Sequence, residues 1–136
     1  DPEPVVPPPP PGITDPVALY RASCASCHGE DGSGAGVAAA ALRPAPRDFR
    51  TGIIKFASVP SGSLPRDEDF ARVIRRGVPG TSMPPFPDLD DSQIRGLVAH
   101  LRSFSPRSAT EAPGDAVAVS PDPFTGHAVG FMVATA

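Results

Sequence analysis

Apolar residues recur at helical spacing in the second half of the chain. The clearest stripe has apolar positions three or four residues apart between positions 94 and 104. At its start, Asp90 and Gln93 have the spacing of a capping box, and Leu89 and Ile94 have the spacing of a hydrophobic staple. The pattern predicts a helix that begins at Asp90 and runs to about Phe104.

Two further helices are predicted upstream. Residues 67–76 combine an acidic start with an apolar stripe and end on two arginines and Gly77, as a helix terminus should. Earlier in the chain, Asp15 can cap a helix whose first position is Pro16. This first helix is expected to continue into the cysteine motif described below. We expect the last helix to cross it and close the core.

The segments between these helices carry few regular signals. Residues 29–36 are rich in glycine and predict a flexible loop. The alanine-rich residues 37–42 allow a helical turn, whereas residues 43–52 should be irregular because they contain two prolines. Residues 53–59 are interpreted as an extended loop, since no partner strand is evident. The fold class expected from these elements is all-α.

The two ends differ in composition from the middle. The chain has 136 residues and 20 prolines, and seven of these prolines lie within residues 1–12. Such a run favours an extended polyproline II conformation. We therefore expect a proline-rich tether over residues 1–13, a compact domain over 14–105 and an extended tail over 106–136. The apolar end of that tail, residues 128–136, is too short to span a bilayer.

Charge and hydropathy argue against nucleic-acid binding and against a membrane-spanning helix. The formal net charge is −3, which gives no basis for nucleic-acid binding. No apolar run approaches the roughly 20 residues of a transmembrane helix, so none is expected in this chain. No signal peptide is visible at its start, and we expect a processed form.

The chemistry is concentrated in the pentapeptide Cys24-Ala25-Ser26-Cys27-His28. A C-x-x-C-H sequence is typical of a c-type haem attachment site. Two thiols at this spacing can each add to one vinyl group of the same haem, and the adjoining imidazole can reach the iron. They are the only two cysteines of the chain, so one haem c attached through Cys24 and Cys27 is the predicted cofactor.

Three other interpretations of the cysteine pair remain open from the residues alone. A Cys24–Cys27 disulfide is possible in an exported protein. A thioredoxin-like redox motif would need a βαβ context, which the pattern lacks. A structural zinc site would need two more ligands, and only His100 and His127 remain outside the motif.

A second axial iron ligand is expected from residues 77–86. Met83 lies there in a segment that glycine and proline stiffen on both sides. A weak thioether ligand needs such a loop, because ordering a flexible one would cost more than the bond returns. The alternative is an ordinary core methionine. Met132 and His100 are weaker candidates, and His127 is expected to be solvated.

These motifs together resemble a class I monohaem c-type cytochrome over Pro16–Phe104. A narrower resemblance, to bacterial cytochrome c domains bound to respiratory or photosynthetic complexes, rests on four stretches of sequence: Pro46-Arg47-Asp48-Phe49, Lys55-Phe56, Ser63-Leu64-Pro65 and Gly80-Thr81-Ser82-Met83-Pro84. The resemblance implies an all-α class I cytochrome c fold wrapped around one covalently attached haem. It further implies a one-electron carrier that is not itself an enzyme and that exchanges electrons with redox protein partners. Its implied setting is periplasmic, as a subunit or tethered domain of a larger membrane-bound complex.

The resemblance also assigns roles around the haem. Iron ligation falls to His28 and Met83. Arg47 and Lys55 are candidates to pair with the haem propionates, to which Tyr20 or Thr81 could add a hydrogen bond. Relatives often have Gly-Pro where this chain has Gly36-Val37, and the Val37 carbonyl is expected to accept the Nδ1 proton of the iron-ligating histidine.

One departure concerns the first helix. Many relatives have a glycine eight residues before the first cysteine, where it packs against the last helix. This chain has Pro16 at that place, so the contact must be made differently.

Two rival functions stay open at this point. A five-coordinate haem enzyme or gas sensor would need an open distal side with a polar group poised for chemistry. A purely structural haem subunit would exchange no electrons on the timescale of turnover.

Overall fold

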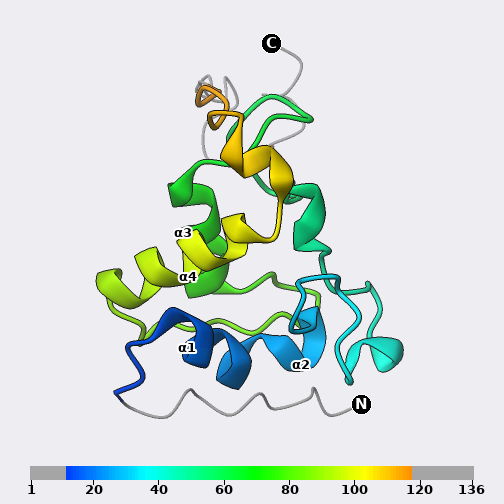
Figure 1. The fold of residues 1–136 in the computed structure, drawn as a ribbon. Helices are drawn as coiled ribbons and strands as arrows, with labels where there is room; N and C mark the ends of the chain where they lie inside the picture. The colour runs from blue at the N-terminus through cyan, green and yellow to red at the C-terminus, as the bar shows by residue number, and fades with distance from the viewer. Residues whose placement is uncertain (1–11, 118–136) are drawn as a thin grey trace, which may run out of the picture.

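The computed structural model describes residues 12–117. Four α-helices lie within this range: α1 (Pro16–Ser23), α2 (Ala25–His28), α3 (Asp67–Arg76) and α4 (Asp91–Ser103). Three short 3₁₀ turns, at Ala39–Ala41, Phe49–Thr51 and Pro106–Ala109, punctuate the loops. No strand occurs between residues 12 and 117, which confirms the all-α prediction (Figure 1).

Local sequence signals account for the start of each long helix. The Asp15 side chain accepts a hydrogen bond from the backbone N–H of Ala18 at 2.9 Å and caps α1. Asp90 and Gln93 form the predicted reciprocal capping box of α4, with distances of 2.7 and 3.0 Å. Asp91 adds an ion pair with Arg75 of α3. The acidic residues at this point therefore serve the helix start.

The first helix differs from the prediction at the cysteine motif. Instead of continuing, α1 ends at Ser23, and Cys24 has φ −125° and ψ −35° before α2 begins. The backbone N–H of Cys24 still donates to the carbonyl of Tyr20 at 2.8 Å. The interruption turns the chain, and both cysteines then face one cavity.

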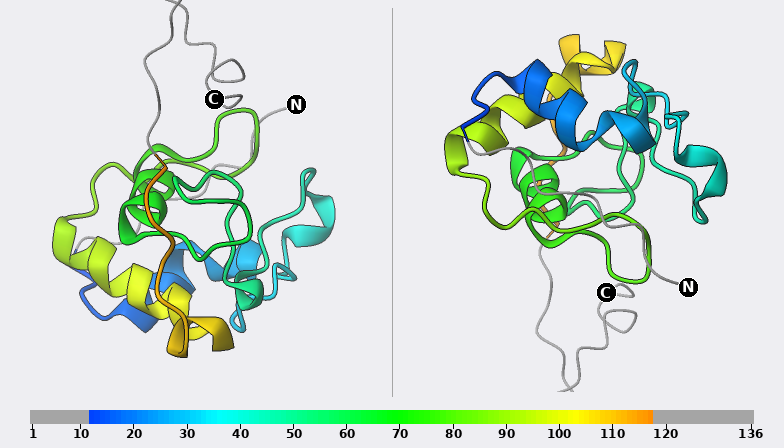
Figure 2. Two further views of the ribbon diagram at one scale, coloured as in Figure 1. Left: turned by 90° about the horizontal axis from the view of Figure 1, so that it is seen from above. Right: turned by 90° about the horizontal axis from the view of Figure 1, so that it is seen from below.

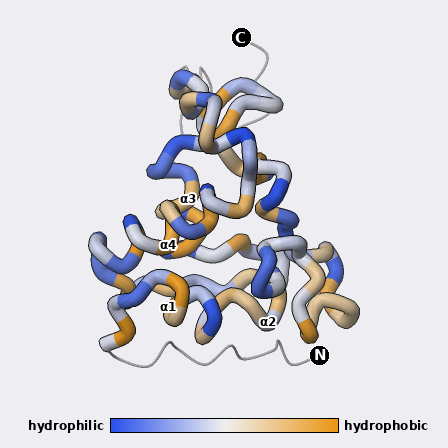
Figure 3. The backbone as a smooth tube through the Cα atoms, in the orientation of Figure 1, coloured by the Kyte–Doolittle hydropathy of each residue, from blue (hydrophilic) through white to orange (hydrophobic). Residues whose placement is uncertain are grey.

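The core forms where α1 and α3 pack against α4. Its fully buried members include Leu19 and Tyr20 of α1 and Leu97 of α4, each no more than 1% exposed. Leu89 and Ile94, the predicted staple, are both buried in this cluster. Apolar stretches of these helices gather where they meet (Figure 3). The predicted crossing of the last helix over the first is therefore confirmed.

That crossing depends on a close approach between Pro16 and Gly96. A Cβ atom placed on Gly96 would lie 2.8 Å from Cγ of Pro16. The small residue therefore sits on α4 and the bulky one on α1, which is how the contact is made without the glycine that relatives carry in the first helix.

Residues after α4 remain packed on the domain through Val117. The N–H of Gly114 donates to the carbonyl of Leu64 at 2.9 Å, and the N–H of Val117 donates to the carbonyl of Ser58 at 2.6 Å. This segment runs across the loop of residues 58–66 (Figure 2). The extended tail predicted from residue 106 thus has an ordered first part. The tether over residues 1–13, apart from its last two residues, and the rest of the tail lie outside the described residues.

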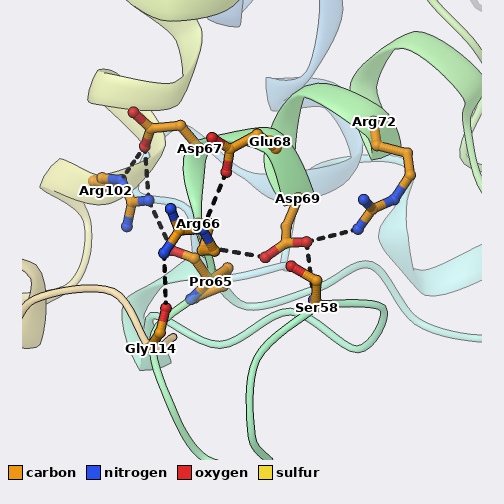
Figure 4. A network of polar contacts seen from close by, with 9 residues as sticks. All are labelled: Ser58, Pro65, Arg66, Asp67, Glu68, Asp69, Arg72, Arg102 and Gly114. Atoms are coloured by element: carbon orange, nitrogen blue, oxygen red, sulfur yellow. Dashed lines mark hydrogen bonds and ion pairs between the residues drawn. The ribbon is translucent and has the colours of Figure 1, made fainter. Parts of the chain in front are cut away.

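A buried carboxylate organises the same loop. Asp69 of α3 is 0% exposed and accepts hydrogen bonds from the backbone N–H groups of Ser58 and Arg66, each at 2.9 Å. Arg72 adds a charged bond of 2.6 Å to Asp69 (Figure 4). Arg72 also donates to the carbonyl of Phe56 at 3.2 Å. Since Lys55 and Phe56 line the cavity described next, this network fixes one of its walls.

Candidate haem site

The cysteine motif opens onto a cavity of about 490 Å³. This volume lies in the range of sites for small organic ligands and cofactors. Cys24, Cys27 and His28 line it from α2 and its junction with α1. The apolar part of the lining comes from α3, α4 and the connecting loops and includes Leu42, Ile54, Phe70, Ile74, Phe86 and Leu97.

Both cysteines carry free thiols, and the environment of Cys24 disfavours redox catalysis. Cys24 and Cys27 are not joined to each other. Burial, with a smaller contribution from the neighbouring Cys27, raises the pKa of the Cys24 thiol to about 12. Thioredoxin-like enzymes need the opposite shift, towards a stable thiolate. No cluster of three or more His, Cys, Asp or Glu side chains occurs in residues 12–117, so a zinc site finds no support there either.

His28 is prepared to bind a metal through one nitrogen. Its Nδ1 lies 3.0 Å from the carbonyl oxygen of Arg47 and donates a hydrogen bond to it, so the neutral ring carries its proton on Nδ1 and leaves Nε2 unprotonated. Burial lowers the pKa of His28, and the bond to Arg47 offsets only part of that effect. The imidazole is therefore neutral at pH 7, the form in which histidine ligates.

The expectation for Val37 is wrong. The carbonyl that meets Nδ1 of His28 is that of Arg47, nineteen residues along the chain. Val37 instead is 96% exposed. The reason is the fold of the loop over residues 42–49, which the sequence could not place and which brings the Arg47 backbone against the imidazole.

Met83 lies in a loop that lines the same cavity as His28. The loop is cross-linked internally: Val78 N–H donates to the Met83 carbonyl at 3.2 Å, and Met83 N–H donates to the Thr81 hydroxyl at 3.1 Å. That hydroxyl in turn donates to the carbonyl of Val78 at 2.7 Å. These bonds give the stiffness that the glycine and proline content predicted. They also occupy Thr81 within the loop.

The remaining predicted residues divide into two groups. Arg47 and Lys55 are exposed at the cavity lining, and neither has a carboxylate partner among residues 12–117. Tyr20, in contrast, does not line the cavity; its hydroxyl donates to the carbonyl of Gly29 at 2.6 Å. The expected role of Tyr20 at a propionate is therefore wrong, because the core has already used that donor.

Of the two weaker candidates for the second iron ligand, only His100 lies within the described residues, and it does not line the cavity. His100 is half-buried against the rings of Tyr20 and Phe104, with centroid distances of 4.9 and 4.8 Å. It is thus a packed helix histidine. His127 and Met132 lie outside the described residues.

Two contributions to the site escaped sequence reasoning. Phe49 stacks on His28, with ring centroids 4.4 Å apart. Ser23 also lines the cavity, and its buried hydroxyl finds no hydrogen-bond partner among the described residues. The only sequence signal for Phe49 was its place in the Pro46-Arg47-Asp48-Phe49 stretch. Nothing in the sequence indicated the role of Ser23.

The residues present fit a haem. Two free thiols, a neutral histidine with an available nitrogen, a predominantly apolar wall and an unpartnered hydroxyl share one cavity. Arg47 and Lys55, which have no carboxylate partner within residues 12–117, are available at its lining for negatively charged propionates. A buried porphyrin would also supply apolar contact that this small core lacks.

Comparison with known proteins agrees with this geometry. The family described as cytochrome c oxidase, cbb3-type, subunit III matches residues 11–101. A solved structure from Kuenenia stuttgartiensis, of a reducing HAO-like protein complex, is similar with a TM-score of 0.75 and 38% sequence identity. The match covers 81% of this chain and 52% of that chain, so this chain spans about half of its neighbour. No curated protein matches.

No helix within residues 12–117 has the length and apolar character needed to cross a bilayer. The family match, the fold and the cavity chemistry together support haem-based electron transfer by a covalently bound c-type haem. The chain is a monohaem c-type cytochrome and belongs to the cbb3-type cytochrome c oxidase subunit III family.

Proposed function

We propose that this domain is a one-electron carrier whose iron is held by His28 and Met83. The observation that carries the proposal is that both side chains line one cavity from different elements, α2 and the loop after α3. When bound there, haem supplies a couple that gains or loses one electron. Every other contribution comes from the chain.

The chain's part is to hold both ligands still. Arg47 fixes the tautomer of His28 through its carbonyl. The internal hydrogen bonds of the Met83 loop place a weak ligand without a large ordering cost at each electron transfer. Histidine and methionine ligation raises the reduction potential, and the apolar wall acts in the same direction by disfavouring the extra charge of the oxidised form.

The alternative of a five-coordinate enzyme or sensor finds little support in the lining. A distal acid or base is needed for chemistry on a bound ligand. Among the described residues, the cavity is lined by no carboxylate and by no histidine besides His28. The hydroxyl of Thr81 is committed to its own loop.

The Met83 assignment is tested by replacing that residue with leucine. The expected results are loss of the weak red sulfur-to-iron band of the oxidised protein, binding of carbon monoxide by the reduced protein, and a fall in reduction potential on the order of 0.1 V, since axial ligands set haem potentials over about 0.8 V. Met132→Leu changes the chain's other methionine and should leave all three unchanged. A Met83→Leu protein with the parental spectrum would contradict the assignment of Met83 as an iron ligand.

We also propose that the domain works in the periplasm as a subunit or tethered domain of a larger membrane-bound electron-transfer complex. The solved neighbour belongs to a protein complex, and the first eleven residues are rich in proline. Deleting residues 1–12 should leave the haem spectrum unchanged and reduce the amount of partner proteins that co-purify. Undiminished co-purification would contradict the role of residues 1–12 as a tether.

A further inference from the structure

One short segment contacts the His28 imidazole in two different ways. The carbonyl of Arg47 meets Nδ1 at 3.0 Å in the direction of the ring edge. Two residues later, the ring of Phe49 lies over the imidazole with a centroid distance of 4.4 Å and an interplanar angle of 25°. The first contact fixes which nitrogen faces the cavity. The second restrains the tilt of the ring.

The segment is itself fixed against the glycine-rich loop that follows the cysteine motif. The N–H of Phe49 donates to the carbonyl of Gly32 at 2.7 Å. Gly34 has φ +81°, and a Cβ atom there would lie 2.7 Å from the carbonyl oxygen of Pro46. A side chain at position 34 would therefore push the segment away from His28. The glycine-rich loop, predicted to be flexible, instead permits this close approach.

Phe49 also contacts a second aromatic ring, and its own turn is capped. Phe104, just after α4, stacks with Phe49 at a centroid distance of 6.3 Å and an interplanar angle of 14°. Asp48 caps the Phe49–Thr51 turn by accepting from the N–H of Arg50 at 2.9 Å, and it also binds the Arg50 guanidinium. Tilting the ring of Phe49 would disturb its stack with Phe104.

We infer that Phe49 is a positioning residue that sets the plane of the His28 imidazole relative to the haem. This inference rests on the proposed function only in that His28 is an iron ligand. Partners of a ligating histidine orient its ring and tune the metal, and stacked aromatic rings favour a defined mutual geometry. A leucine at position 49 keeps apolar contact but cannot stack, so the ring would be held by the Arg47 carbonyl alone.

The test uses proton NMR of the oxidised, haem-loaded protein. The shifts of the four haem methyl groups depend on the orientation of the axial ligand planes. Phe49→Leu should change the spread or the order of these four shifts, and Phe49→Tyr, which can still stack, should restore the parental pattern. Phe70→Leu removes another ring from the cavity lining, one with no stacking contact to His28, and should leave the order unchanged.

An unchanged methyl pattern in Phe49→Leu would overturn the inference, and so would an equal change in Phe70→Leu. If Phe49→Leu yields no haem protein, the reduced parental protein decides the matter. Nuclear Overhauser contacts between the ring protons of Phe49 and His28 support the inference, and their absence overturns it. Failure of Met83 ligation is separately visible in the reduced protein as the lack of an upfield-shifted methionine methyl signal.

Discussion

Replacing Asp69 with asparagine should be among the most damaging nearly isosteric changes in this domain. One carboxylate oxygen accepts from Ser58 N–H and Arg72, and the other accepts from Arg66 N–H. An asparagine can keep only one acceptor oxygen in place, and its amide nitrogen then faces a donor (Figure 4). The side chain is 0% exposed, so water cannot compensate.

The magnitude follows from these contacts. A buried donor left unsatisfied costs about 1–3 kcal/mol, and bonds that lose a charged partner fall from about 1.5–3 to about 1 kcal/mol each. With some relaxation, we expect Asp69→Asn to lower the free energy of unfolding by about 2–4 kcal/mol. The matched control is Asp67→Asn on the same helix. Asp67 is 75% exposed and pairs with Arg102, and such surface pairs contribute about 0–1 kcal/mol.

The same comparison has a predicted pH dependence. Burial alone would raise the pKa of Asp69, but hydrogen bonds from Arg66, Arg72 and Ser58 outweigh burial and lower it. Because the folded-state pKa is depressed, the stabilisation is fully present above the ordinary carboxyl pKa of about 3.9 and is lost as the pH falls through the folded-state value. The loss of unfolding free energy in Asp69→Asn, relative to the parent, should therefore become smaller only at acidic pH.

The assay is guanidinium unfolding of the haem-loaded proteins at pH 7 and at several acidic values, followed by far-ultraviolet circular dichroism. The reasoning is refuted if Asp69→Asn lies within about 0.5 kcal/mol of Asp67→Asn at pH 7, a difference no larger than ordinary surface changes. A deficit that grows towards low pH would refute the sign of the pKa argument.

Two further predictions concern the helix crossing and the cavity lining. Gly96→Ala should lower the free energy of unfolding by up to about 2 kcal/mol in thermal or chemical unfolding. Overpacking against Pro16 costs about 1–3 kcal/mol, and the higher helix propensity of alanine offsets about 1 kcal/mol of this. An alanine variant more stable than its parent would contradict the close contact. Arg47→Gln and Lys55→Gln should each lower the reduction potential by about 20–45 mV. Each change removes a nearby cation whose interaction of about 0.5–1 kcal/mol disfavours the oxidised form. Unchanged potentials in spectroelectrochemical titration would exclude a role at the propionates.

Local signals predicted the regular elements well because each depends on residues close in sequence. The capping box of Asp90 and Gln93 fixed the start of α4, and the acidic start and Gly77 bracketed α3 within its observed bounds. The cysteine motif and Met83 lie far apart in the sequence, but each belongs to a compact motif of the kind that a c-type haem needs, and both line one cavity.

Contacts between distant segments account for what the sequence could not predict. The partner of His28 is Arg47 rather than Val37 because the path of an irregular loop decides it. The ring of Phe49 and the packing of Val117 on Ser58 depend on the same kind of loop geometry. Tyr20 was considered for a propionate because a tyrosine hydroxyl suits that role, but in the structure this hydroxyl donates to the Gly29 carbonyl.

The most direct test of the account is a visible spectrum of the oxidised and the dithionite-reduced protein, followed by carbon monoxide added to the reduced form. We predict sharp reduced bands, a weak red sulfur-to-iron band in the oxidised state, and no response to carbon monoxide. Together these results would mean that His28 and Met83 hold the iron of an electron carrier. A large shift with carbon monoxide would mean an open or labile iron, and would contradict the account in favour of catalysis or gas sensing.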